Sequence, residues 1–168
     1  MVLFQKKATF NQNKLDSAIL TEGVLYNAKE GIIKFNDVDF IQNKAGDKDY
    51  VMDNANGHSL GGNAGIRNSG NIEISGISNF KQNTAIGMSG TVAAISNSGT
   101  LKFIGHAIFE ENYSEDVRTG NVFGVVNNNG GGILEFTTAD FLNNMSISPS
   151  TNGGALSVYG KTSKLSFT

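Results

Sequence analysis

Cysteine and tryptophan are absent from the 168-residue chain, and proline occurs only once. Without cysteine the chain forms no disulfide framework and no cysteine zinc site, and it has no thiolate nucleophile. One proline beside 21 glycines excludes the collagen triple helix, which needs abundant proline and a glycine at every third position. No apolar run approaches the roughly 20 residues with which a helix crosses a bilayer. The first residues also lack the apolar stretch of a signal peptide.

Charge is scarce as well, because charged residues make up 17% of the chain and the formal net charge is −2. This balance offers no basic surface to nucleic acid or anionic lipid. We therefore expect no nucleic-acid partner, and contact with a membrane only through a domain outside this segment. Hydrophobic residues, at 39%, are numerous enough to form a core. Glycine and asparagine, 21 of each, are in excess, although neither favours helix or strand interiors.

A tetrapeptide, Phe-x-x-Asn, recurs along the chain. Its copies run from Phe10 to Asn13, Phe40 to Asn43, Phe80 to Asn83, Phe109 to Asn112, and Phe141 to Asn144. The later copies each follow a short run of alternating apolar and polar residues, and a Gly-led apolar segment lies upstream of each run. The runs are Ile33–Phe35, Ile72–Ile74, Leu101–Phe103 and Leu134–Phe136, and a further one, Leu165–Phe167, ends the chain. Recurrence of this three-part unit indicates a repeat architecture.

The three parts of each unit have the features of short strands. They alternate with period two and are bounded by Gly, Asn and Ser, whereas no segment shows sustained helical periodicity. Three short strands in each repeat of about 30 residues predict an all-β parallel β-helix of about five coils without substantial helix. With neighbouring coils about 4.8 Å apart, the rod would be roughly 24 Å long.

Particular positions are expected at particular places in the coils. The Phe of each tetrapeptide should point inward and stack on the Phe of the next coil, while the Asn should bond backbone groups or the next Asn at a turn. Asn68, Asn97 and Asn127 are expected at one corner, where the backbone bends through the positive φ that Gly and Asn tolerate. One outward column should alternate in charge along the rod. Its residues are Lys34, Glu73, Lys102, Glu135 and Ser166.

These motifs resemble those of the polymorphic outer membrane protein repeat family, best known from chlamydiae. The defining tetrapeptides of that family are Phe-x-x-Asn and Gly-Gly-Ala followed by Ile, Leu or Val. The residues Gly153, Gly154, Ala155 and Leu156 match the second one, and its other copies here are degenerate.

The resemblance implies a right-handed β-helix in the passenger of an autotransporter, located at the bacterial cell surface or outer membrane or secreted. It implies a non-enzymatic virulence adhesin that attaches to a host-cell protein or glycan, and in that family both tetrapeptides are associated with adhesion. Under this interpretation residues 1–168 form a single β-helix segment excerpted from a longer passenger domain.

Residues 44–60 form the longest departure from the repeat. They contain the densest set of oxygen ligands in the chain, which are Asp47, Asp49, Asp53, Asn54, Asn56 and His58. The EF-hand pattern fails here, because Val51 and Ala55 occupy ligand positions. Three interpretations stay open: a solvated loop, a loop that binds a partner, and a looser Ca²⁺ site. We predict no other cofactor.

Two other function classes are compatible with a β-helix. An architectural spacer, or a fibre unit that self-associates through its open ends, would use the same fold. A polysaccharide-binding or polysaccharide-degrading β-helix would place several carboxylates on one strand face. The acidic residues here fall at turns or singly within runs. His58 and His106 show no spacing typical of a Ser-His-Asp triad or a metal site. We therefore expect no catalytic residues and no resident metal.

Overall fold

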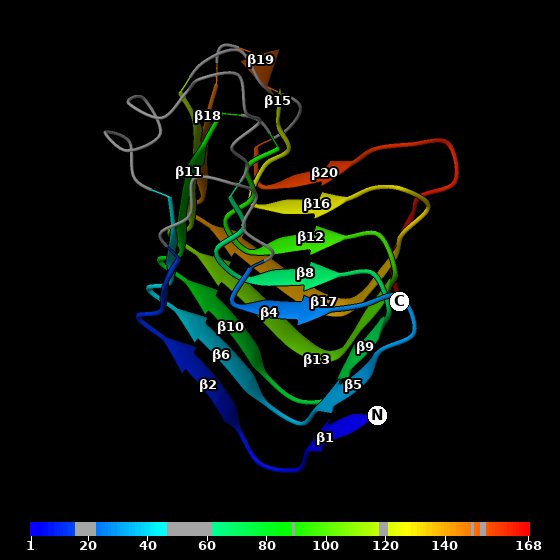
Figure 1. The fold of residues 1–168 in the computed structure, drawn as a ribbon. Coiled ribbons are helices and arrows are strands. Elements are labelled where there is room, and N and C mark those ends of the chain that lie inside the picture. Colours follow the sequence, from blue (N-terminus) through cyan, green and yellow to red (C-terminus); the bar gives the residue numbers. More distant parts are fainter. Residues whose placement is uncertain (16–22, 47–61, 89, 118–120, 149, 152–153) are drawn as a thin grey trace.

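The computed structural model describes residues 1–15, 23–46, 62–88, 90–117, 121–148, 150–151 and 154–168. All regular secondary structure in these residues is β-strand, and every strand pairing among them is parallel. The strands wind into a parallel β-helix, which confirms the predicted fold class (Figure 1). No helix in the described part of the chain is long and apolar enough to cross a membrane.

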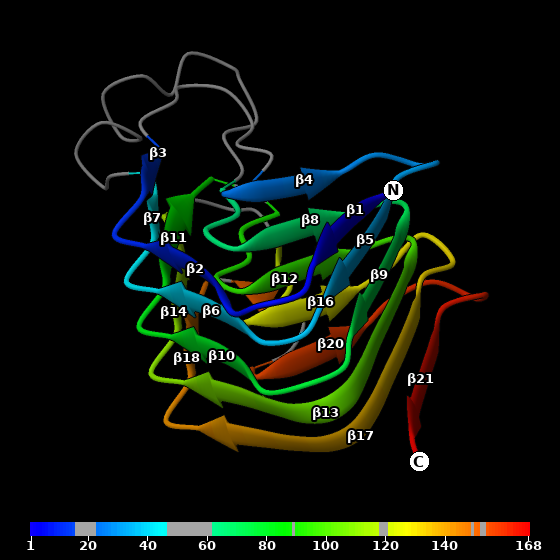
Figure 2. The ribbon, with the colours of Figure 1, turned by 90° about the horizontal axis from the view of Figure 1, so that it is seen from below.

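Three main sheets form the walls of the rod, and the first sheet is bent into two halves (Figure 2). Its first half contains β1 (Val2–Phe4), β5 (Ile32–Phe35), β9 (Asn71–Ile74), the start of β13 (Thr100–Glu110), the start of β17 (Ile133–Leu142) and β21 (Lys164–Phe167). Its second half contains β2 (Ala8–Asn11), β6 (Val38–Ile41), β10 (Ser78–Lys81) and the ends of β13 and β17. The alternating runs and the Phe-x-x-Asn segments thus form the two halves of this sheet.

The second and third sheets contain shorter strands. The second sheet contains β3 (Lys14–Leu15), β7 (Lys44–Ala45), β11 (Thr84–Gly87), β14 (Tyr113–Asp116) and β18 (Met145–Ile147). The third contains β4 (Leu25–Asn27), β8 (Ile66–Asn68), β12 (Ile95–Asn97), β16 (Val126–Asn128) and β20 (Leu156–Val158). Strands β15 (Asn121–Val122) and β19 (Ser150–Thr151) pair separately. Each coil therefore contributes four strand segments to three sheets, and the segment after each Phe-x-x-Asn was not among the three predicted parts.

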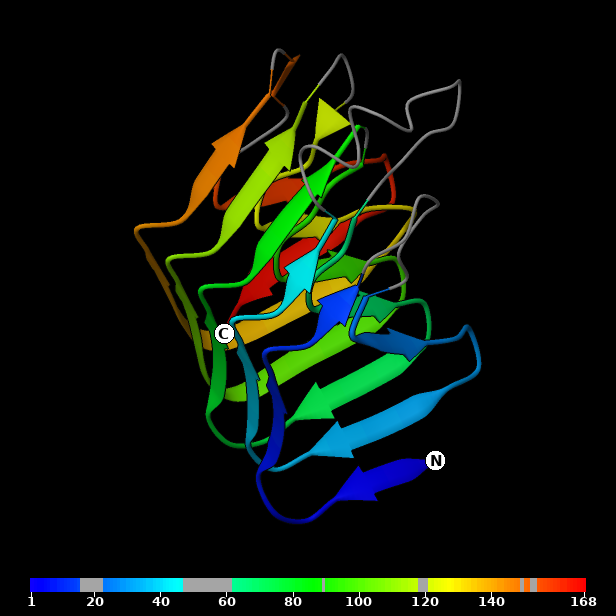
Figure 3. The ribbon, with the colours of Figure 1, turned by 60° about the vertical axis from the view of Figure 1, so that its left-hand side comes forward.

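Successive coils lie on one another in the order of the sequence (Figure 3). The register joins equivalent residues, so that Phe80 pairs with Phe40 on one side and with Phe109 on the other. The Phe ring centroids of neighbouring copies are 4.6, 5.1, 4.9 and 4.8 Å apart from Phe10 to Phe141. The predicted column of stacked rings is therefore confirmed.

A second column of large apolar side chains runs beside the first. Phe103 and Phe136 stack at 4.9 Å, and both meet Phe109 edge to face at 6.2 and 6.1 Å. Phe103, Phe109 and Phe136 are buried. Stacked rings within a column and edge-to-face rings between columns both suit the quadrupole of the aromatic ring. The core of the rod therefore contains a continuous Phe column from the second half of the first sheet. Beside it lies a column from the first half, in which Ile74 stands between Phe35 and Phe103.

Glycine is required where two coils approach most closely. A Cβ on Gly65 would collide with the carbonyl oxygen of Ala94 in the next coil. Gly65 directly follows Gly61-Gly62-Asn63-Ala64, a degenerate copy of the second tetrapeptide, and lies immediately before β8. The residue that follows this copy therefore lies at a corner where backbone packs on backbone.

Candidate interaction surface

The Phe-x-x-Asn residues of the middle coils face the interior. Phe40, Phe80 and Phe109 have no exposed surface, and Asn43 and Asn83 are also fully buried. The structure thus brings the motif copies together as internal columns, as the spacing predicts. Only the terminal copies, with Phe10 and Phe141, are partly exposed, since each ring is covered on one side.

The Asn residues of the tetrapeptides form a continuous ladder of amide hydrogen bonds. Each Nδ2 donates to the Oδ1 of the Asn in the following coil at 2.9–3.0 Å. The backbone N–H of the same residue donates to that oxygen at 3.0–3.1 Å. The ladder comprises Asn13, Asn43, Asn83, Asn112 and Asn144. The three buried members, Asn43, Asn83 and Asn112, are therefore satisfied inside the rod, as buried amides must be.

A second Asn ladder lies at the end of the third sheet, and here the prediction for one residue is wrong. Asn27, Asn68, Asn97 and Asn128 occupy one column, with Nδ2–Oδ1 distances of 2.9, 2.8 and 2.7 Å. The predicted member Asn127 instead pairs in register with Ser96. Asn128 lies eight residues after Gly120, whereas Asn97 lies seven residues after Gly90. The segment before this corner is therefore one residue longer in that coil, and equal spacing from the glycine points to Asn127 instead.

At this corner the expected positive φ belongs to glycines, which are Gly130, Gly131 and Gly160, and not to the Asn residues. Among the described non-glycine residues, positive φ belongs to the residue just before each Asn of the tetrapeptide. These residues are Gln12, Gln42, Gln82, Glu111 and Asn143, with φ of 52–55°. The backbone N–H of Gln42 donates to the carbonyl of Lys81 in the next coil at 2.9 Å. The left-handed conformation costs an L-residue roughly 1–2 kcal/mol. At Gln42 this conformation is accompanied by a backbone hydrogen bond to the next coil.

The side chains of these left-handed residues form an exposed ladder that the sequence analysis missed. Gln12 donates to Gln42 at 3.1 Å, and Gln42 donates to Gln82 at 3.0 Å. Gln82 in turn donates to Glu111 at 2.8 Å. The signal was present in the sequence, since the residue before each motif Asn is always polar with a carbonyl or carboxyl oxygen.

The outward charge column has the predicted alternation. Lys34 Nζ lies 3.0 Å from Glu73 Oε1, and Lys102 Nζ lies 2.8 Å from Glu135 Oε2. The pKa of Lys102 is raised, chiefly by its hydrogen bond and its attraction to Glu135. Lys81 and Glu110 form a similar pair at 2.7 Å on the next wall. These carboxylates therefore pair with lysines of neighbouring coils.

The remaining predicted site residues that the structure describes do not come together in one place. Gly153 and the loop residues Asp47, Asp49, Asp53, Asn54, Asn56 and His58 lie outside the described residues. The backbone N–H groups of Val125 and Val126 donate to the carbonyls of Gly154 and Ala155, and Leu156 begins β20. His106 lies at the surface, where its Nε2 is 2.9 Å from Asp140 Oδ2. Residues 1–15, 23–46, 62–88, 90–117, 121–148, 150–151 and 154–168 contain no group of three or more His, Cys, Asp or Glu that could hold a metal.

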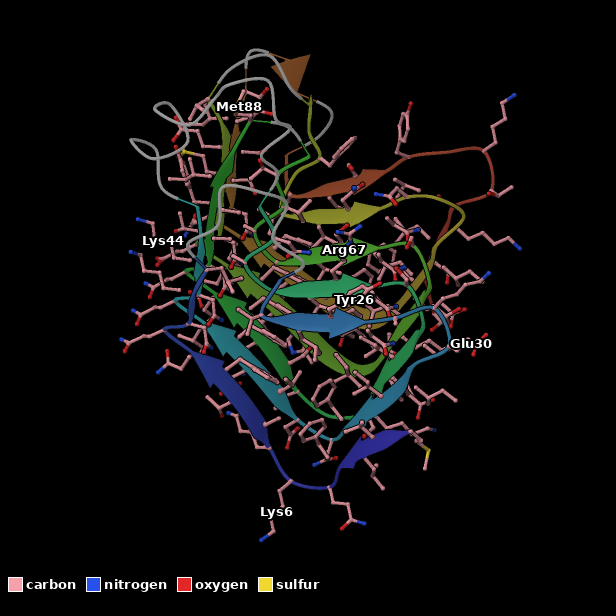
Figure 4. The ribbon with its side chains drawn as sticks, in the orientation of Figure 1. Lys6, Tyr26, Glu30, Lys44, Arg67 and Met88 are labelled. Atoms are coloured by element: carbon pink, nitrogen blue, oxygen red, sulfur yellow. The ribbon has the colours of Figure 1, made fainter. Side chains whose placement is uncertain are left out.

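Two hollows on the outer walls are lined by residues that the structure describes. One, of about 250 Å³, lies over β5, β9 and β13 and is lined by Ile32, Lys34, Asn71, Glu73, Thr100 and Lys102. The other, of about 330 Å³, is lined by Ile41, Lys81, Gln82, Glu110 and Glu111. Figure 4 shows a third outward feature, Tyr26 and Arg67 on adjacent strands β4 and β8, with the guanidinium carbon 6.0 Å from the ring centroid.

No family model, no curated protein and no solved structure matches the chain. The class of protein is therefore given by the fold alone, as a parallel β-helix built on internal Phe columns and Asn ladders.

Proposed function

We propose that the chain is a non-enzymatic segment of a bacterial surface protein of the autotransporter-passenger type, which attaches to host cells. In this role the rod is a rigid support, and its outward columns and loops contact a host-cell protein or glycan. Weak contacts repeated along the rod would add through avidity. The resemblance of the motifs to the outer membrane repeat family supports the location at the cell surface.

The observation that carries this proposal is the separation of constant interior from variable exterior. One inward position of the first sheet repeats Phe from coil to coil, and the ladders repeat Asn. Another inward position holds only small or medium side chains, which are Val38, Ser78 and Ala107. The outward position beside them changes from Ile41 to Lys81 to Glu110 in successive coils. Packing thus constrains the interior, while the exterior is free to vary in chemistry. Such a division is typical of a scaffold that displays a binding surface.

The acidic side chains of the walls support a binding scaffold over a hydrolase. Glu73, Glu110 and Glu135 each form an ion pair with a lysine of a neighbouring coil. A glycosidase needs two carboxyl groups on opposite sides of one bond, one of them protonated. Carboxylates paired with lysines along the rod serve instead to hold the coils in register.

The test is attachment of the fluorescently labelled chain to cultured epithelial cells. A variant in which residues 47–60 are replaced by a scrambled segment of the same composition, with β7 and Gly46 kept, separates loop-borne from wall-borne attachment. Circular dichroism of both proteins controls for folding. Saturable attachment of the wild-type chain supports the proposal, and attachment no greater than that of an unrelated β-helix of similar size contradicts it.

An architectural role is the second candidate, as a fibre unit that associates through the ends of the strand stack. The partly exposed Phe10 and Phe141 rings lie at opposite ends and could cover one another between copies. The first half of the first sheet has six strands, however, while the other columns have five. Head-to-tail stacking would therefore require β1 or β21 to be displaced. Light scattering measures the molar mass of the chain at high concentration. A single species with the mass of the monomer would contradict a self-stacking fibre unit.

A further inference from the structure

The hollow over β5, β9 and β13 contains two polar side chains whose hydrogen-bonding capacity is unused. Asn71 and Thr100 are directly paired in register, so they lie side by side on adjacent strands about 4.8 Å apart. Neither side chain forms a hydrogen bond within the described part of the chain, and both reach solvent. An amide supplies donors and an acceptor, and a hydroxyl supplies one donor and two acceptor positions. The pair can therefore bind neighbouring hydroxyl groups of a ligand.

The other hollow differs in this respect. Gln82 already accepts from Gln42 and donates to Glu111, and Lys81 is paired with Glu110. Its polar groups are mutually engaged, so a ligand there would have to displace existing contacts. This contrast favours the hollow with Asn71 and Thr100 as a binding site.

An apolar side chain completes the first hollow. Ile32 pairs in register with Asn71 and is 41% exposed. The next residues along the two strands, Ile33 and Ile72, face inward and are buried. Ile32 presents an aliphatic surface beside the amide and the hydroxyl. An apolar surface with a few placed polar groups is the usual composition of a small-ligand site. Sugar rings match it, because a pyranose carries C–H groups on its faces and hydroxyls around its edge.

The charged wall of the hollow selects against an ionic ligand. Lys34 is paired with Glu73, and Lys102 is paired with Glu135, so positive and negative groups alternate along the wall. Potentials of alternating sign cancel over the length of a polymer, and exposed charges are further screened by salt. The wall therefore gives no net attraction to sulfated or carboxylated chains.

We propose that this hollow binds one ring of a neutral glycan, with the ring against Ile32 and its hydroxyls bonded to Asn71 and Thr100. The inference rests on the proposed function and names the ligand class for one wall of the rod. About 250 Å³ lies below the roughly 300–1,000 Å³ of drug-sized sites, which suits a single ring of a longer chain. The expected affinity of one site is millimolar, and repetition on a cell surface would raise it.

The experiment is a titration of the isotope-labelled chain followed by amide NMR. The probes are β-linked tetrasaccharides of glucose, galactose and N-acetylglucosamine, with a heparin tetrasaccharide as the sulfated comparator. At least one neutral probe should shift the amides of β5, β9 and the start of β13. Thr100→Val and Asn71→Ala should each weaken that binding roughly two- to tenfold, the value of one hydrogen bond. Gln82→Ala, in the other hollow, is the matched control and should bind as the wild-type chain does.

Other results overturn the inference. These are the absence of shifts with every neutral probe, shifts only with heparin, and shifts centred on the hollow at Gln82. Equal binding by the wild-type chain and Thr100→Val also overturns it. Cell attachment distinguishes this failure from failure of the proposed function. If Asn71→Ala and Thr100→Val attach to cells normally but no neutral probe binds, the adhesin proposal stands without this site.

Discussion

Asn83 donates twice to one oxygen of Asn112, from its backbone N–H at 3.0 Å and from its Nδ2 at 2.9 Å. Its Nδ2 also donates to the carbonyl of Phe40 at 2.8 Å, and its Oδ1 accepts the N–H and Nδ2 of Asn43. Both amide protons and both lone pairs of a fully buried side chain are thus engaged. Among side chains of this length only an amide can do this, because a carboxylate has no donor and a hydroxyl has one.

Asn83→Ala is expected to lower the free energy of unfolding by roughly 3–5 kcal/mol. The change removes the acceptor of two buried donors on Asn43 and the donor to the Phe40 carbonyl, and each orphaned group costs about 1–3 kcal/mol. Urea unfolding monitored by circular dichroism measures the effect. Gln82→Ala changes the exposed neighbouring residue and should stay within about 0.5 kcal/mol. Equal losses for both variants would contradict the buried ladder as a source of stability.

Phe80→Ala should cost about 3–5 kcal/mol, because it leaves a cavity in a stacked column. The Phe80 ring lies 5.1 Å from that of Phe40 and 4.9 Å from that of Phe109, and it has no exposed surface. Lys102→Ala removes an exposed partner of Glu135 and should change stability by no more than about 0.5 kcal/mol. The same unfolding measurement compares them, and a large loss for Lys102→Ala with a small one for Phe80→Ala would reverse the inward and outward assignment.

Ser78→Ala should leave stability unchanged or raise it by up to about 2 kcal/mol. The Ser78 hydroxyl is fully buried between Val38 and Ala107, and it has no hydrogen-bond partner in the described residues. Alanine removes the desolvated hydroxyl and leaves only a small void. Ser114→Ala is the matched control, since its buried hydroxyl donates to the carbonyl of Gly124 at 3.2 Å. That control should lose about 1 kcal/mol, and a comparable loss for Ser78→Ala would reveal a partner for its hydroxyl.

The sequence predicted the elements whose side chains repeat. Phe and Asn recur in register because the interior of each coil must match the coils on both sides, so spacing alone was enough to place Phe80 on Phe40 and Phe109. The alternating runs likewise predicted β5, β9 and the starts of β13 and β17. In each case packing selects one kind of side chain at one position, which leaves a readable pattern.

The second sheet could not be predicted because packing does not select one side chain there. Thr84, Tyr113 and Met145 pair in register although they share no chemistry. Small residues such as Ala85 and Ser114 fill the inward position. The hollow over β9 could not be predicted either, because it depends on Asn71 and Thr100 lying side by side on adjacent strands. Their pairing is known only from the strand register, since the number of residues in each repeat differs from coil to coil.

Tyr113 provides a test by pH. Burial, with a 2.7 Å hydrogen bond to Glu115, raises the pKa of the Tyr113 phenol to about 12 in the folded chain. In the unfolded chain the pKa is about 10, so between roughly pH 10 and 12 the unfolded state loses its proton first. The contribution of this group to stability is thus complete below pH 10 and falls as the pH rises toward 12.

Tyr113→Phe cannot ionise and should not show this part of the alkaline loss. The measurement is urea unfolding of both proteins at a series of pH values, in which lysines and other tyrosines titrate alike and cancel in the difference. The difference in unfolding free energy between the wild-type chain and Tyr113→Phe should be constant below about pH 10 and should shift against the wild-type chain above it. A difference independent of pH up to 12 would mean that the phenol is solvated and not held protonated by its place beside Glu115.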